Sequence, residues 1–420
     1  MKLLHLADLH LGRLFHEQSL IEDQHYVLNQ VLDILGADQY RALILAGDIY
    51  DRSIPSVEAV SLFGSFLNML HSRFPDLAVC MIAGNHDSPD RLAFGRELFQ
   101  SMNIHIVSDP NLAFNPILLD DGQERCAIFL LPFLYPGSLE RTRTDTEAHQ
   151  KDAPTAEGQE AEPRGLRTQK ELVAEASMRL ESARRALENQ GIHQSVLVAH
   201  LFTQGGTESE SERLFIGTAE QVDVSQFAGF SYVALGHLHR CQKVRSQENA
   251  WYAGSPLAYS FGEADQEKVC LSVELTGNPA TENPATVRVT PIPLQPLHPV
   301  RRIEASFTEL MQAPVNTELA KSYLEVELTD EHLVENVQRI LEHRYPLILS
   351  VKQNRGFRTL LTERAAMQGA LPQGLGAGTE RRRSTLDDFK AFEETLYGSV
   401  DQGKLNLFTT LLEQCRHETL

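Results

Sequence analysis

Five short polar motifs stand directly after predicted buried strands of this sequence. They carry carboxylate, amide and imidazole side chains, and no cysteine lies among them. Oxygen ligands mixed with imidazole nitrogen suit Mn²⁺, Fe²⁺ or Zn²⁺ better than a structural zinc held by thiolates. In chain order the motifs are Asp8-Leu9-His10, Gly47-Asp48, Gly84-Asn85-His86-Asp87, His200 and Gly236-His237-Leu238-His239. Their residue types predict a metal centre.

The spacing within the motifs indicates what such a centre would do. D-x-H and H-x-H place two side chains on one face of an extended segment, so that one strand end can offer two ligands. The carboxylate of Asp48 has two oxygens and can bridge two ions. Two ions about 3.5–4 Å apart can hold an attacking hydroxide and the non-bridging oxygens of a phosphate ester. The motifs therefore predict phosphate-ester hydrolysis at a two-metal centre.

Each motif taken alone also has a purely structural explanation. A single D-x-H is commonly surface polarity, and Gly47-Asp48 is a good turn sequence. The Gly84 motif could be an Asn turn before a helix, and His200 could be a hydrogen-bonded core histidine. The combination favours a site, because ligands of layered α/β sheets bind outside the carboxyl ends of the strands.

Short apolar runs alternate with amphipathic stretches through the first half of the chain. Strands are predicted at 2–6, 42–46, 77–83, 127–131, 195–199 and 232–235. Helices are predicted at 21–35, 57–70 and 166–190. This alternation predicts a layered α/β domain.

Composition shifts divide the chain further. Four prolines between Pro291 and Pro299 mark a boundary, after which a strand at 323–328, a helix at 331–344 and a strand at 347–351 predict a small α/β unit. A glycine-rich stretch then precedes a helical segment at 386–415. The predicted organisation is a catalytic domain at 1–298 with a polar insertion at 138–165, a small domain at 299–368, a linker at 369–385 and C-terminal helices at 386–420.

Charge and cysteine usage limit the class of protein. The net charge of −19 argues against a protein that coats DNA through a basic surface, yet it allows an enzyme whose metal ions supply the positive charge. The five cysteines are scattered and form no C-x-x-C pair, as in reduced cytoplasmic proteins. No apolar run approaches the roughly 20 residues of a membrane span. We expect a cytoplasmic protein without a membrane partner.

The motifs in this order resemble the calcineurin-like metallophosphoesterases. More narrowly, they resemble the SbcD family of bacterial double-strand-break repair nucleases. The resemblance rests on H-x-A-D-L-H-L-G at 5–12, A-G-D-I-Y-D at 46–51, A-G-N-H-D-S at 83–88, A-L-G-H-L-H at 234–239 and Y-A-G-S-P at 252–256. It implies a layered β-sandwich of the calcineurin-like α/β fold flanked by helices, with a small α/β capping domain and C-terminal helices.

The resemblance also implies a role for each motif residue. One ion would be held by Asp8, His10, Asp48 and His239, and the other by Asp48, Asn85, His200 and His237. His86 matches the family's catalytic histidine, which contacts the phosphate or protonates the leaving oxygen, as a 3′-alkoxide requires.

One position departs from the family pattern. Where archaeal members carry a second phosphate-side histidine, this chain has Asp51, whose carboxylate would more readily orient Arg52 or a histidine near the metals. Arg13 and His16 could contact the DNA backbone, or they could be ordinary solvated groups.

The function implied by the resemblance is a two-metal nuclease, most simply with Mn²⁺. It would act as a double-strand exonuclease and a single-strand and hairpin endonuclease in DNA repair, recombination and replication. Its partners would be DNA and an SbcC-type ABC ATPase bound through the C-terminal helices, with two nuclease chains forming a homodimer within a heterotetramer. It would be cytoplasmic, and associated with the nucleoid when bound to DNA.

Two other functions stay open from the sequence. One is a metallophosphoesterase acting on cyclic nucleotides or phosphoproteins, although a minimal phosphatase needs no domain after Pro299. The other is a non-catalytic protein that bridges DNA, although every predicted ligand position holds a competent residue type.

Overall fold

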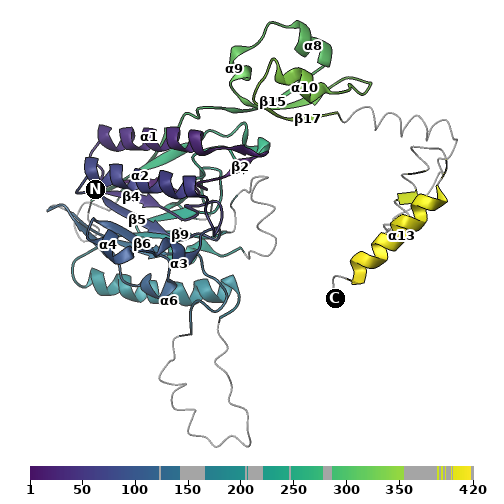
Figure 1. Ribbon diagram of the computed structural model, residues 1–420. Coiled ribbons are helices and arrows are strands. Elements are labelled where there is room, and N and C mark those ends of the chain that lie inside the picture. Colours follow the sequence, from purple (N-terminus) through teal and green to yellow (C-terminus); the bar gives the residue numbers. More distant parts are fainter. Residues whose placement is uncertain are drawn as a thin grey trace, which may run out of the picture. The chain divides into compact units, whose positions relative to one another are not determined.

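The computed structural model divides the chain into two compact units, Met1–Gly356 and Phe357–Leu420, which are described separately (Figure 1). It describes residues 1–122, 124–141, 166–203, 206, 221–245, 247–277, 286–353 and, near the C-terminus, 386, 389–390, 393, 399 and 401–417. Most of the predicted insertion at 138–165 and all of the predicted linker at 369–385 lie outside these residues. Within the described part, no helix is long and apolar enough to cross a membrane.

Two six-stranded sheets form the centre of the first unit. The first contains, in order, β14 (Thr286–Pro293), β13 (Val269–Thr276), β1 (Lys2–Leu6), β4 (Ala42–Leu45), β5 (Ala78–Ile82) and β6 (Ile104–Val107). The second contains β11 (Gln242–Lys243), β12 (Ala250–Tyr252), β10 (Tyr232–Gly236), β9 (Gln194–His200), β8 (Arg125–Leu131) and β7 (Ile117–Asp120). β1, β4, β5 and β6 are parallel to one another, as are β8, β9, β10 and β12.

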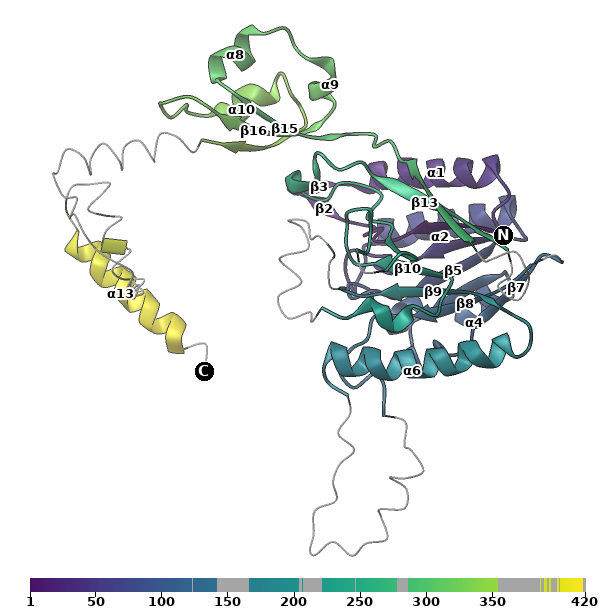
Figure 2. The same ribbon diagram turned by 180° about the vertical axis from the view of Figure 1, so that it is seen from behind.

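The sheets are stacked face to face, with helices on their outer faces (Figures 1 and 2). α1 (Ile21–Ala37) and α2 (Val57–Arg73) cover the first sheet, and α6 (Gln169–Glu188) covers the second. Alternate residues of β1 show this layering, since Leu4 packs under the helices and Leu3 packs between the sheets. Strands buried on both faces read as continuous apolar runs. The predicted layered α/β fold is confirmed.

Shorter elements connect these layers. They are β2 (Leu14–Phe15), β3 (Gln18–Ser19), α3 (Pro89–Leu92), α4 (Arg96–Gln100), η1 (Pro110–Leu112), η3 (Val224–Phe227) and η4 (Phe261–Glu263).

A separate three-stranded parallel sheet follows the proline-rich segment. It is formed by β15 (Val300–Ala305), β16 (Tyr323–Leu328) and β17 (Ile348–Lys352), with α8 (Phe307–Gln312), α9 (Thr317–Ala320) and α10 (Val337–Glu342). The strand predicted at 323–328 is confirmed. The helix predicted at 331–344 is wrong in length, because Asn336 has a left-handed backbone (φ 52°) just before α10 begins.

Part of the proline-rich segment that was predicted as a domain boundary is a strand. β14 extends through Pro291 to Pro293, opposite Leu271 and Val269 of β13. A strand can contain prolines here because β14 is an edge strand, whose outer N–H groups need no partner.

In the second unit, α13 (Gln402–His417) is the longest described element. The continuous helix predicted at 386–415 is wrong around Ser399 and Asp401, which are not helical. The Asp401 carboxylate accepts hydrogen bonds from the backbone N–H groups of Gly403 and Lys404, so that it caps a new helix. Within this unit the rings of Phe389 and Phe408 stack, with centroids 4.1 Å apart.

Candidate metal centre

The carboxyl ends of parallel strands from both sheets meet at one edge of the sandwich. β1 leads to Asp8, β4 to Asp48 and β5 to Asn85, while β9 ends at His200 and β10 leads to His237. The structure therefore brings together all five predicted motifs. Which of their atoms bind metal stays a prediction.

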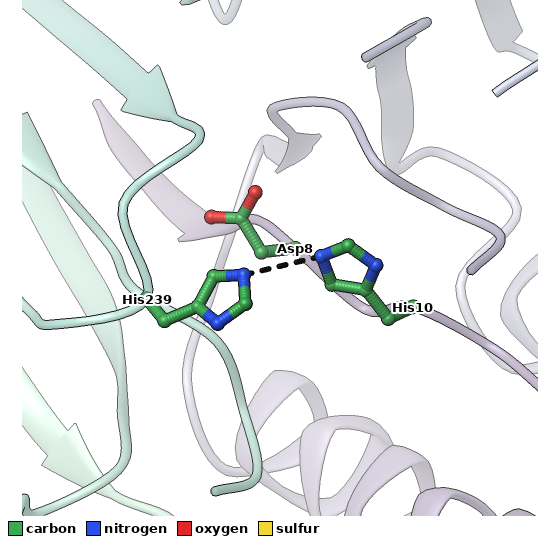
Figure 3. Close-up of side chains that lie close together, drawn as sticks. All are labelled: Asp8, His10 and His239. Atoms are coloured by element: carbon green, nitrogen blue, oxygen red, sulfur yellow. Dashed lines mark hydrogen bonds between the residues drawn. The ribbon is translucent and has the colours of Figure 1, made fainter. Parts of the chain in front are cut away.

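The first group of side chains consists of Asp8, His10 and His239 (Figure 3). Their ligand atoms lie within 4.8 Å of one another, and all three residues are buried. The Nε2 atoms of His10 and His239 are 3.2 Å apart. Two imidazole nitrogens thus converge beside one carboxylate.

The second group consists of Asn85, His200 and His237. Oδ1 of Asn85 lies 3.0 Å from Nε2 of His200 and 3.1 Å from Nδ1 of His237. The backbone carbonyl of Ala46 lies 2.9 Å from Nδ1 of His200 and fixes the plane of that ring. One amide oxygen and two imidazole nitrogens therefore converge here.

Asp48 stands between the two groups. Its Oδ2 atom lies 3.4 Å from Nε2 of His200 and 3.6 Å from Nε2 of His10. Its other oxygen accepts a hydrogen bond from the backbone N–H of His86 at 2.9 Å. A Cβ atom at Gly84 would lie 2.1 Å from Oδ1 of Asp48, so only glycine fits at this position. Asp48 has the placement that a bridging ligand requires.

The donor spacing fits two divalent ions. Two donors that each lie about 2.1 Å from one ion are about 3.0–3.4 Å apart at octahedral or tetrahedral angles. The Nε2 pair of His10 and His239, at 3.2 Å, matches this spacing. So do the two contacts of Asn85, at 3.0 and 3.1 Å. No thiol is present in any described group of potential ligands.

The backbone that carries the ligands is not extended. Asp8, His10, Asp48 and His237 have φ angles of 53°, 42°, 50° and 107°. The argument that D-x-H and H-x-H present two ligands from an extended strand is therefore wrong. The chain turns sharply after each strand, and such left-handed backbone costs about 1–3 kcal/mol per residue, which surrounding contacts must offset. One of these contacts is the hydrogen bond from His10 N to Asp48 O, at 2.9 Å.

Burial and proximity shift the pKa values of these groups. Burial lowers the pKa of His10 to about 4 and that of His237 to about 3, so both rings are neutral and keep a lone pair for a metal. Burial raises the pKa of Asp8 to about 7. Burial also opposes ionisation of Asp48, but the nearby His200 and His10 hold the pKa of its carboxyl well below its usual range.

His200 behaves differently from the other two histidines. Burial would lower the pKa of its ring, but the carboxylates of Asp48 and Asp8 raise it to about 9. The two carboxylates thus attract positive charge into the centre of the site. A bound divalent cation would supply that charge.

His86 lies at the more exposed side of the site. It is half-buried, and its Nδ1 is 2.9 Å from the backbone oxygen of Asp51. Its ring centroid is 4.8 Å from that of His10, and a ring nitrogen belongs to a possible ligand group with His10 and Asp48. Its expected role as a catalytic group rather than a ligand stays a prediction.

Asp51, the residue that departs from the family pattern, contacts several residues of the site. Its Oδ1 lies 2.7 Å from Nη1 of Arg13 and 3.5 Å from Nδ1 of His10, and its Oδ2 lies 3.6 Å from Nε of Arg52. The carboxylate thus lies beside Arg52, as expected, but closer to Arg13, and the histidine next to it is the proposed ligand His10. His16 is exposed, and its ring centroid lies 5.2 Å from that of Phe261. Contact of Arg13 or His16 with DNA stays a prediction.

Asp87 is a structural anchor that the sequence did not reveal. Its buried carboxylate accepts hydrogen bonds from the backbone N–H groups of Ile49, Tyr50 and Gly84, at 2.9–3.0 Å. It therefore ties the Asp48 loop to the Asn85 loop. The only feature of the sequence that pointed to Asp87 was its position within the Gly84-Asn85-His86-Asp87 motif.

Gln24 holds the loop that follows β1 in a similar way. Its side chain donates hydrogen bonds to the backbone oxygens of Leu9 and His10, at 3.3 and 2.7 Å, and accepts one from the N–H of Gly12 at 3.0 Å. Nothing in its local sequence distinguishes it from other polar helix residues.

Two family models match the chain. Residues 1–241 match the calcineurin-like phosphoesterase model. Residues 296–396 match a model described as the type 5 capsule protein repressor C-terminal domain.

Relatives of known name match most of the chain. A protein of Staphylococcus epidermidis, named as the SbcD component of the nuclease SbcCD, is 31% identical over 352 residues, covering 84% of this chain and 85% of the relative. The protein of the same name from Staphylococcus saprophyticus is 31% identical over 354 residues, covering 84% of each chain. A solved structure of the calcineurin-like phosphoesterase YfkN from Bacillus subtilis is 10% identical, with a TM-score of 0.36, and covers 69% of this chain and 90% of that chain.

Proposed function

Because this chain belongs to the SbcD family of calcineurin-like phosphoesterases, and is a metal-dependent nuclease of the SbcCD type, we propose that it cleaves DNA with two divalent ions. The proposed ions are Mn²⁺. The proposed activities are exonuclease action on double strands and endonuclease action on single strands and hairpins, in DNA repair, recombination and replication.

The placement of Asp48 is the observation that carries this proposal. One carboxylate oxygen faces His10 of the first group at 3.6 Å and His200 of the second at 3.4 Å. A protein that merely bridges DNA has no use for such an arrangement, whereas in-line hydrolysis of a phosphodiester uses a pair of ions about 3.5–4 Å apart.

In this proposal Asp8, His10, Asp48 and His239 would hold one ion, and Asp48, Asn85, His200 and His237 would hold the other. The bound ions supply a water of lowered pKa and neutralise the charge of the phosphate. His86, whose Nδ1 contacts the Asp51 carbonyl, presents its other ring nitrogen to donate a proton to the leaving 3′ oxygen. Asp51, whose backbone oxygen contacts His86, also forms an ion pair with Arg13 at 2.7 Å.

A substrate comparison tests the proposal. The full chain with Mn²⁺ is offered hairpin DNA and, separately, a generic phosphomonoester. We expect efficient metal-dependent cleavage of the hairpin and little turnover of the monoester, with both activities absent in Asp48→Ala. Preference for the monoester would instead support the phosphatase alternative.

We also propose DNA, an SbcC-type ATPase and a second copy of this chain as partners, in the cytoplasm and at the nucleoid. In the second unit, Leu407 of α13 is 62% exposed, as an apolar anchor for a partner's groove would be. In the first unit, Ile54 just before α2 and Val57 and Val60 at its start are exposed apolar residues that suit self-association. Analytical ultracentrifugation of the full chain checks the homodimer, and a monomer at micromolar concentration would contradict it.

A further inference from the structure

A buried ion pair contacts one proposed metal ligand on two sides. Oε1 of Glu263 faces Nδ1 of His239 at 3.6 Å. Oε2 of Glu263 lies 2.7 Å from Nζ of Lys268, which also donates a hydrogen bond to the backbone oxygen of His239 at 3.0 Å. Glu263 is 0% exposed and Lys268 is 7% exposed. The pair therefore contacts both the ring and the main chain of His239.

The surroundings hold Glu263 in place. Ser260 donates its hydroxyl hydrogen to Oε1 of Glu263 at 3.0 Å, and the backbone N–H of Tyr259 contacts Oε2 at 3.3 Å. Lys268 also donates to Oγ of Ser255 at 2.9 Å. A buried ion pair rarely improves stability over an apolar pair of similar volume. Stability alone therefore does not explain this one.

The other imidazole of the first group has a similar neighbour. Oδ1 of Asp51 lies 3.5 Å from Nδ1 of His10. Both rings therefore have a carboxylate on the side opposite the nitrogen that faces the proposed ion, since their Nε2 atoms face each other at 3.2 Å.

In the second group the corresponding carboxylate contact is longer, since Oδ1 of Asp8 lies 4.0 Å from Nδ1 of His200. Nδ1 of His200 faces a neutral acceptor, the backbone oxygen of Ala46, at 2.9 Å. Nε2 of His237 is buried and, like Nδ1 of His10, has no hydrogen-bond partner in the part of the chain that the structure describes. The third donor is the uncharged amide of Asn85, where the first group has the carboxylate of Asp8.

We infer that Glu263, braced by Lys268 and aided by Asp51, is a positioning residue that makes the Asp8–His10–His239 site the tighter of the two metal sites. This inference rests on the proposed two-metal function. A carboxylate facing Nδ1 of His239 favours the tautomer with its proton on Nδ1, which leaves the lone pair of Nε2 for the ion. The carboxylate of Asp8, where the second group has the neutral amide of Asn85, also favours a divalent cation at this site over the other.

Mn²⁺ binding to the full chain, measured by isothermal titration calorimetry and by electron paramagnetic resonance, tests the inference without an activity assay. We expect two classes of site in the wild-type chain. In Glu263→Gln the tighter class should weaken about 10–100-fold, the usual effect of losing such an outer partner. The weaker class should be unchanged. Glu267→Gln, the same substitution at an exposed position, should leave both classes unchanged.

A double variant separates positioning from folding. Glu263→Gln leaves Lys268 buried without its partner, which could unfold the chain. Glu263→Gln with Lys268→Met removes both charges and should fold, with the same loss in the tighter class. Equal weakening of both classes, or of neither, in the folded double variant would overturn the inference and leave the two-metal proposal intact. A wild-type chain that binds fewer than two ions would overturn the two-metal proposal itself.

Discussion

The two halves of the metal centre differ although the same edge of the sandwich builds both. The half with Asp8, His10 and His239 is buried and has Asp51 and Glu263 beside its imidazoles. The half with Asn85 has one neutral amide donor, which is only half-buried. In our account the charge-rich half holds a resident ion, and the second half gains negative charge when a DNA phosphate arrives. We therefore propose that one fold provides two different metal environments through the residues that contact the ligands.

Asp48 is the residue that the two halves share, so its loss should have the largest effect. We expect Asp48→Ala to bind neither ion and to lose nuclease activity by more than the roughly 10⁴-fold upper range of a lost acid–base group. His10→Ala should mainly weaken one ion. Metal content per chain, measured by mass spectrometry of the elements, separates the two variants. Equal metal loss in both would remove the bridging assignment.

Substitution of His86 should slow DNA cleavage without changing metal binding in either half of the site. We expect His86→Ala to slow hairpin cleavage about 10²–10⁴-fold, because a general acid contributes about that much. Metal content should stay at the wild-type level. If metal content falls together with activity, His86 is a ligand, as its place beside His10 and Asp48 also allows.

Asn85→Asp should make the two halves more alike. A carboxylate in place of the amide adds a charged donor to the weaker half, so its Mn²⁺ affinity should rise about tenfold, in line with the dependence of cation affinity on ligand charge. Calorimetric titration measures the change, with the tighter class as an internal control. If the Mn²⁺ affinity of the weaker class does not change, ligand charge does not cause the difference in affinity between the two classes.

Removal of residues 385–420, the end of the second unit, should leave metal binding in both halves unchanged. Every proposed ligand lies between Asp8 and His239, in the first unit. A chain ending before Thr385 should therefore keep its metal-dependent activity on single-stranded DNA. Its co-purification with the ATPase partner should be lost. Tight binding by the truncated chain would place the interface elsewhere, and lost activity would make the C-terminal helices part of the catalytic core.

The sequence predicted the parts of the molecule whose pattern is local. β1 and β4 were recognisable because both of their faces are buried, and the polar motifs that meet at the candidate site were recognisable at the strand ends. Glu263 could not be predicted, because its short 3₁₀ helix carries no pattern and its partner His239 lies 24 positions earlier. The left-handed backbone of Asp8 and His10 was also unpredictable, since hydrogen bonds to a neighbouring loop impose it.

A crystal structure of the full chain grown with Mn²⁺, with anomalous scattering recorded at the manganese edge, tests the central claim most directly. Our account predicts two peaks about 3.5–4 Å apart. Asp48 should bridge them, and the peak beside His239 should have the higher occupancy when Mn²⁺ is limiting. A single peak, or two peaks without a shared Asp48 oxygen, would contradict the account.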